Sequence, residues 1–158
     1  MKFKVTALIA AAVSGSLAAA ALIAKKTLPV VDDPAADEIA LVSIFDGTAL
    51  RPTSTRFRGG TVLSMFGGTV LDLRRAGLPP GGAQLTVTSL FGGTEIVVPD
   101  TWIVEVSGPA IFGGVSRSTP EPHLLPADNP RLTVRSRAAF GGTAVAARPV
   151  LRTAEAPA

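Results

Sequence analysis

The sequence contains no cysteine and no tyrosine, and only one histidine and one tryptophan. Without cysteine the chain has no disulfide, no thiol nucleophile, no cysteine-based zinc site and no cysteine to carry a lipid anchor. One histidine, His123, supplies too few ligands for an ordinary transition-metal site. We therefore expect no metal, no cofactor and no cysteine chemistry.

Amphipathic helical periodicity is also missing from the part of the chain that follows the N-terminal apolar stretch. The 16 glycines and 13 prolines interrupt every candidate segment. Short alternating runs are present instead, as in 131–135, where Leu and Val face one side and Arg and Thr the other. This pattern predicts a single all-β domain.

Lysine is confined to four positions that flank the N-terminal apolar stretch, namely Lys2, Lys4, Lys25 and Lys26. The 11 arginines all follow residue 50 and are balanced by the 12 acidic residues, so the rest of the chain is close to neutral. The high pI of about 10.0 therefore reflects the N-terminal lysines and not a basic face. Because nucleic-acid binding needs clustered basic residues, we expect no nucleic-acid partner.

The stretch 5–24 is uncharged and, as a helix, would be about 30 Å long, which is the thickness of a bilayer core. Two interpretations of residues 1–26 remain open. The lysine pair at 25–26 resembles a stop-transfer flank and favours a single transmembrane anchor. The alternative is a cleaved signal peptide, with the first lysines as its basic region and small residues around 16–20 as its cleavage site, which would make the protein secreted.

Composition divides the remainder into three parts. Residues 27–40 are rich in Pro, Asp and Glu and predict an acidic linker. Residues 41–150 hold the predicted β domain, and 151–158 form a C-terminal tail.

An internal repeat runs through the predicted domain. Phenylalanine followed by one or two glycines recurs with spacings of 21, 25, 21 and 28 residues, which is the range of solenoid repeats. The residues that define it are Phe45, Phe66-Gly67-Gly68, Phe91-Gly92-Gly93, Phe112-Gly113-Gly114 and Phe140-Gly141-Gly142. Phe57 begins a similar sequence but lies outside this spacing.

Each repeat predicts a strand, a corner at the glycines and a second strand. Glycine adopts positive φ without steric cost, so we expect the glycine pair to make the tight corner. Stacked repeats would place the Phe rings above one another inside the domain, in one dry column. The fold class that follows is a β-solenoid-like stack of Phe-Gly-Gly repeats, preceded by one N-terminal apolar helix.

The segments Phe66–Arg74 and Phe91–Trp102, followed by Phe112-Gly113-Gly114, resemble the LiaF-like C-terminal domain, also described with the toast-rack domains of bacterial cell-envelope stress proteins. The resemblance covers about residues 41–150. It implies a β-solenoid-like domain on a membrane protein that senses or relays envelope stress, often by modulating a sensor histidine kinase. It supplies no catalytic residue that can be transferred. This chain departs from the usual arrangement because it has one apolar span and not several.

Other candidate sites are weak. Asp72, Glu95, Asp100 and Glu105 fall on expected strand faces or in turns, where carboxylates keep a sheet soluble. No glycine pair is followed by the lysine and helix of a phosphate-binding loop. We expect Trp102 to have a packing role at the edge of the stack.

Arg131, Arg135 and Arg137 share one face of a predicted strand, and Arg58, Arg74 and Arg75 on other repeats would extend them into a positive stripe. Such a stripe suits anionic headgroups or an acidic partner; the other interpretation is a set of solvated charges that protect strand edges.

Taken together, these features predict a protein that is not an enzyme. The sequence favours a single-pass membrane protein whose β domain is an interaction module for envelope-stress signalling, with a sensor kinase or another membrane protein as its partner. The alternative is a structural β-solenoid that self-associates as a homo-oligomer at the membrane surface.

Overall fold

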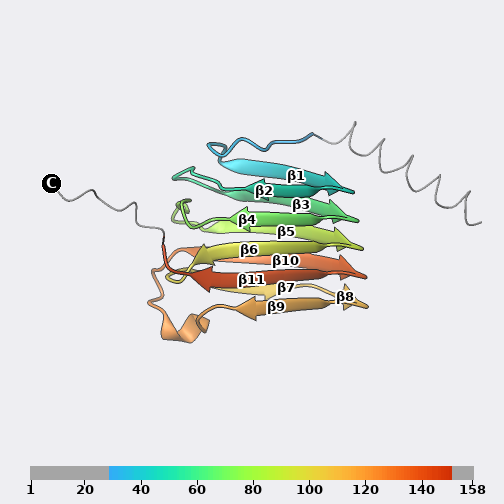
Figure 1. The fold of residues 1–158 in the computed structure, drawn as a ribbon. Helices are drawn as coiled ribbons and strands as arrows, with labels where there is room; N and C mark the ends of the chain where they lie inside the picture. Colours follow the sequence, from blue (N-terminus) through green and yellow to red (C-terminus); the bar gives the residue numbers. More distant parts are fainter. Residues whose placement is uncertain (1–28, 151–158) are drawn as a thin grey trace, which may run out of the picture.

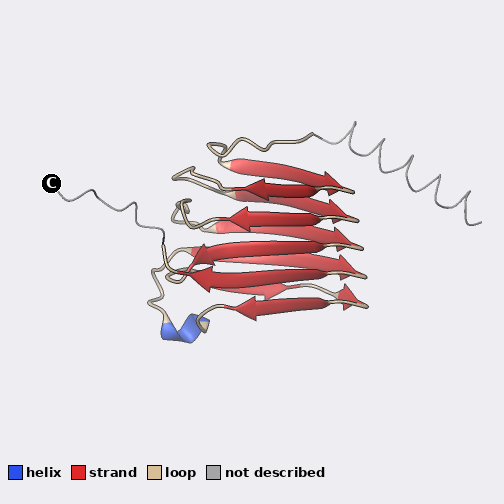
Figure 2. Ribbon diagram, in the orientation of Figure 1, coloured by secondary structure: helices blue, strands red, loops and turns tan. Residues whose placement is uncertain are grey.

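The computed structural model describes residues 29–150, and these residues form an all-β stack (Figure 1). Figure 2 shows that the only helical turn among them is a short 3₁₀ segment on the long connection before the last strand pair. The elements are β1 (Glu38–Ile44), β2 (Gly47–Leu50), β3 (Gly59–Met65), β4 (Gly68–Asp72), β5 (Ala83–Leu90), β6 (Gly93–Pro99), β7 (Ile103–Ser107), β8 (Ala110–Ile111), β9 (Gly114–Ser118), η1 (Pro122–Leu124), β10 (Arg131–Ala139) and β11 (Gly142–Arg148).

The strands form two parallel sheets that face each other. Sheet A has the order β1-β3-β5-β10-β7, with β8 also paired to β10, and sheet B has the order β2-β4-β6-β11-β9. A strand of sheet A leads through a Phe-Gly corner into a strand of sheet B, and we call each such pair a rung. Every corner lies at the same end of the stack (Figure 1). The β-solenoid-like fold expected from the sequence is confirmed.

The rungs do not stack in chain order. The final rung, β10–β11, lies between the β5–β6 rung and the rung formed by β7, β8 and β9. Residues 119–130, which contain η1, make the connection that permits this insertion. As a result β10 pairs with strands on both of its edges, whereas β9 pairs only with β11 in the described part of the chain.

The hydrophobic core fills the space between the two sheets. Alternate residues of each strand point inward, as the period of two requires, and Leu85, Val87 and Val134 are fully buried. Phe57, the phenylalanine outside the repeat spacing, is also fully buried in this core. Trp102 joins it at 4 % exposure.

The domain begins earlier than the sequence indicated. β1 starts at Glu38, within the segment expected to be linker, and Val31 forms an antiparallel bridge to Ala40. Asp37 accepts a hydrogen bond from Ser54, which ties the acidic segment to the loop after β2. The predicted apolar N-terminal helix and the tail 151–158 lie outside the described residues. Within residues 29–150 no helix is long and apolar enough to cross a membrane.

Candidate functional site: the column of Phe-Gly corners

The five corners share one backbone conformation, and it differs from the expected one. Positive φ falls on the phenylalanines, with values from 50° to 55°, and not on the glycines that follow them. Side chains rarely adopt this left-handed region, because Cβ is crowded there by the backbone. The prediction that the glycine pair provides the positive φ of the turn was therefore wrong.

The first glycine of each pair is required for a different reason, which is the close approach of neighbouring rungs. A Cβ on Gly67, Gly92 or Gly141 would overlap the carbonyl oxygen of the corresponding residue in the rung above. Gly113 has the same relation to Gly141. Asp46 occupies this position in the β1–β2 rung, which is the end rung on the side to which these Cβ positions point, so a side chain fits there.

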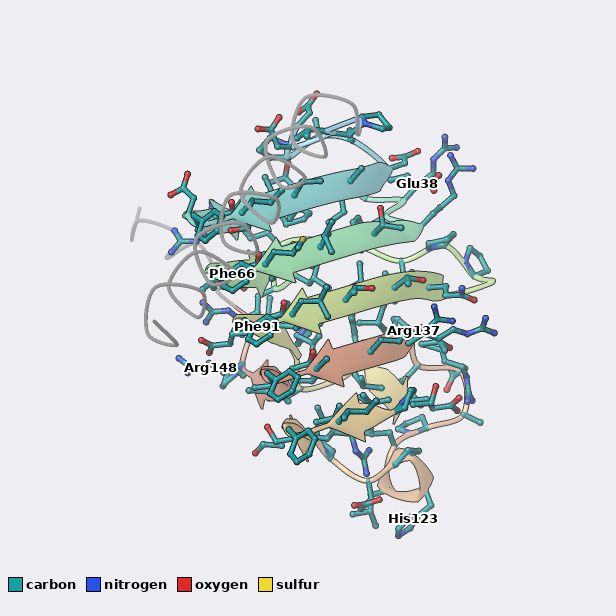
Figure 3. All side chains as sticks on the ribbon, turned by 90° about the vertical axis from the view of Figure 1, so that its right-hand side faces the viewer. Glu38, Phe66, Phe91, His123, Arg137 and Arg148 are labelled. Carbon is teal, nitrogen blue, oxygen red and sulfur yellow. The ribbon has the colours of Figure 1, made fainter. Side chains whose placement is uncertain are left out.

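The phenylalanine rings form a continuous stack along the corners, in the order Phe45, Phe66, Phe91, Phe140 and Phe112. Successive ring centroids are 4.8, 4.9, 4.9 and 5.3 Å apart, and the interplanar angles do not exceed 11°. Figure 3 shows this phenylalanine column from the corner side, with Phe66 and Phe91 one above the other.

The column lies outside the core, which corrects the expectation of a dry interior column. Four of its rings are 52 % to 80 % exposed, and only Phe66 is half-buried. The left-handed φ turns each ring away from the space between the sheets. The sheets converge at the corner, and the room left inside admits only small side chains.

Hydroxyl groups fill the inside of the corners. Ser64 Oγ lies 2.7 Å from Thr69 Oγ1 and 3.0 Å from Thr94 Oγ1, and Ser89 Oγ lies 3.1 Å from Thr94 Oγ1. Ser136 donates to Thr143 in the same way in the last rung. This hydroxyl ladder was missed from the sequence, although a signal was present: serine precedes the phenylalanine by two residues, and threonine follows it by three, in each of the first three rungs.

The second glycine of each pair makes a bare strip on the outer face of sheet B. Gly47, Gly68, Gly93, Gly142 and Gly114 are paired in register across the sheet. A Cβ at Gly47 or Gly114 would meet nothing within 4 Å, so packing within the fold does not require glycine there. A shallow, mainly apolar groove runs over this strip, and Val70 and Ala144 also line it.

The arginines do not assemble into the expected stripe. Arg131, Arg135 and Arg137 are exposed on β10, and Arg131 forms an ion pair with Glu105. Arg58 lines a shallow hollow on the outer face of sheet A with Glu38 and Thr86. Arg74 follows β4 of sheet B, and its guanidinium forms an ion pair with Asp72.

Asp72 is buried, contrary to the expectation of a solvated carboxylate. Its oxygens accept hydrogen bonds from Arg74 Nε at 2.9 Å and Arg74 Nη2 at 2.8 Å, and from the backbone N–H of Arg74 at 3.2 Å. These hydrogen bonds from Arg74 hold the pKa of Asp72 below its usual value, against the effect of burial. The pair joins the end of β4 to the loop that follows it, and Arg74 also lines a shallow hollow with Arg75 and Trp102.

His123 lies on η1, exposed to solvent and far from the corners (Figure 3). No group of three or more His, Asp or Glu side chains that could hold a metal ion occurs within residues 29–150. What the described surface offers is a rigid aromatic column, a bare strip beside it and an exposed arginine face, all of which suit binding.

Comparison with known proteins places this geometry in a family. Neither a curated protein nor a solved structure matches the chain. The family model described as "Cell wall-active antibiotics response LiaF, C-terminal" matches residues 45–124. This match spans half of the 158 residues and runs from the first Phe-Gly corner to η1. The chain belongs to the LiaF-like C-terminal domain family.

Proposed function

We propose that the chain is a non-enzymatic, membrane-associated interaction module of the cell-envelope stress response, acting on a sensor kinase or another membrane protein. The family match carries the proposal, because its members are named for the response to cell wall-active antibiotics. The described surface supports it: exposed binding features are present, and the titratable groups are dispersed or paired with each other. A rigid stack of rungs suits a protein that works by holding a partner.

The arginine face of β10 is the part of the surface that we assign to a protein partner. Arg135 and Arg137 are exposed and take part in none of the ion pairs formed within residues 29–150. They project from a central strand that is fixed on both edges, so their positions are well defined. An acidic segment of a membrane partner would complement them.

Cells that lack the protein, complemented with the wild type or with variants, test this function. We expect loss of the protein to change tolerance to wall-active antibiotics, and affinity purification after cross-linking to recover a membrane protein. The double variant Arg135→Glu, Arg137→Glu should weaken that recovery at least several-fold. Arg75→Glu, an exposed arginine outside β10, is the matched control. If the wild type recovers no membrane partner and its loss leaves antibiotic tolerance unchanged, the proposal is wrong.

Self-association is the second candidate, and the open edge of β9 favours it. At the other end of the stack Val31 bridges to β1, and Asp46 replaces the glycine that a further rung above it would require. Head-to-tail growth is therefore blocked at one end, and association through β9 would stop at a dimer. Light scattering after size-exclusion chromatography decides this: a concentration-independent monomer excludes the second candidate.

A further inference from the structure

The end of the stack that carries the corners is apolar and almost uncharged. The five corners, each counted from two residues before the phenylalanine to two residues after it, contain one charged residue in total, Asp46. The next nearest charge is Arg137, three residues before Phe140. Phe112 and Ile111 are 80 % and 60 % exposed, and Phe45, Phe91 and Phe140 are each more than half exposed. The column is about 20 Å long, because five rungs are spaced as neighbouring strands are.

This apolar end is not explained by packing within the fold. Glycine would adopt the left-handed corner without strain, and asparagine with less strain than phenylalanine, yet all five corners carry phenylalanine. Stacking stabilises the rings against each other, but it leaves their outer edges in water. Strained positions that persist outside the core point to a function for the strained side chain.

The described residues that precede β1 point back toward the same end. Val31 pairs antiparallel with Ala40, so the chain upstream of Val31 leads in the direction in which β1 runs, toward the corners. Val31 follows Lys26 by five positions, and Phe45 follows Ala40 by five positions. Since an extended chain advances about 3.3 Å per residue, Lys26 can reach the level of the column.

Charges gather at the opposite end. Glu38 and Arg131 begin β1 and β10 at this end. The strand end and the loops there carry further charges, namely Asp72, Asp100, Glu121 and Asp128. The described part of the molecule is thus polarised from an apolar end at the corners to a charged end opposite it.

We propose that the phenylalanine column rests on a lipid bilayer, with its rings at the boundary between headgroups and acyl chains. Exposed phenylalanine rings gain free energy when they leave water for the boundary between headgroups and acyl chains, and Lys25 and Lys26 would add attraction to anionic headgroups. The strands then run roughly perpendicular to the bilayer, and the charged end faces away from it toward protein partners. The inference rests on the proposed membrane association and adds to it the surface of the domain that contacts lipid.

The absence of cysteine permits a direct test with the full chain. Ile111→Cys places one thiol beside the column, and Leu124→Cys places one on η1, where the leucine is a comparably exposed aliphatic residue at 70 %. Each variant is labelled with an environment-sensitive fluorophore and reconstituted into phosphatidylcholine and phosphatidylglycerol vesicles. Quenching by a nitroxide-bearing lipid is compared with quenching by aqueous iodide.

We expect the lipid quencher to act at least several-fold more strongly on the label at position 111 than on the label at position 124, and iodide to show the opposite order. Phe112→Asp, which places a charge on the most exposed ring position, should reduce lipid quenching at position 111, while Leu124→Asp should not. Because Phe112 stacks on one ring only, thermal unfolding is expected to be little changed and serves as the check on folding.

Three results would overturn the inference. A label at position 111 that is as open to iodide as the one at 124 shows the column in water. Protection from both quenchers shows it covered by protein, such as a second copy or the apolar N-terminal segment. Vesicle flotation separates the proposals: a chain that does not float refutes membrane association and the column inference together, whereas a chain that floats with a water-exposed column refutes the second alone.

Discussion

At the residue scale, the two glycines of a corner have different roles, and one pair of variants separates them. Gly92→Ala drives a Cβ into the carbonyl of Gly67, which the stacked rungs cannot move. We expect it to lower the free energy of unfolding by about 1–3 kcal/mol. Gly93→Ala places its Cβ 3.9 Å from the nearest atom and should change stability by no more than about 0.5 kcal/mol. Denaturant unfolding followed by the fluorescence of Trp102 measures both, and equal effects would contradict the assignment.

The buried carboxylate of Asp72 makes stability depend on acid. Because hydrogen bonds from Arg74 lower its pKa in the folded state below 3.8, its contribution is complete above the unfolded pKa and is lost as the pH falls through the folded pKa. Asp72→Asn should destabilise by about 1–3 kcal/mol at pH 7 and show a shallower loss of stability below pH of about 4. Asp100→Asn, in an exposed turn, controls for removal of one negative charge. An unchanged acid profile in Asp72→Asn would exclude this role.

At the element scale, the hydroxyl ladder joins rungs that are distant in sequence. Ser64 bonds to Thr69 in its own rung and lies 3.0 Å from Thr94 in the next. Ser64→Ala removes both contacts inside a corner that excludes water, and it should cost about 1–3 kcal/mol because the threonine hydroxyls lose a partner. Ser116→Ala, on the exposed strand β9, is the matched control. Thermal unfolding that ranks the two variants equally would show that the ladder contributes little.

The elements that could be predicted from sequence are those set by local patterns. Alternation marks the strands, and the Phe-Gly spacing marks the corners, since both depend on near neighbours. Phe57 lies in the core, whereas the rings of the phenylalanine column lie outside it. Whether a ring points inward or outward is decided only when the rungs stack. The same is true of Asp72, whose burial follows from the loop that Arg74 begins. Hydrophobicity predicted the ring positions incorrectly because a left-handed φ at each phenylalanine reverses the direction of the side chain.

At the scale of the whole molecule, the insertion of β10–β11 is the feature that no local pattern shows. A solenoid adds each repeat to the previous one, whereas here the last repeat separates the third from the fourth. The β7–β9 rung has its sheet partners only in residues 131–148. The C-terminal rung therefore completes the fold and places the exposed edge of the stack at β9.

This arrangement predicts an order of local opening. The amides of β10 are held between β5 and β7 around fully buried Leu132 and Val134, so they should exchange with solvent only through global unfolding, at about 5–15 kcal/mol. β9 is paired on one edge and has no buried residue, so its amides should exchange first among the strands of sheet B. Hydrogen exchange read by mass spectrometry on residues 29–150 measures this order. Protection in β9 equal to that in β10 would contradict the open edge and would indicate that a further strand covers it.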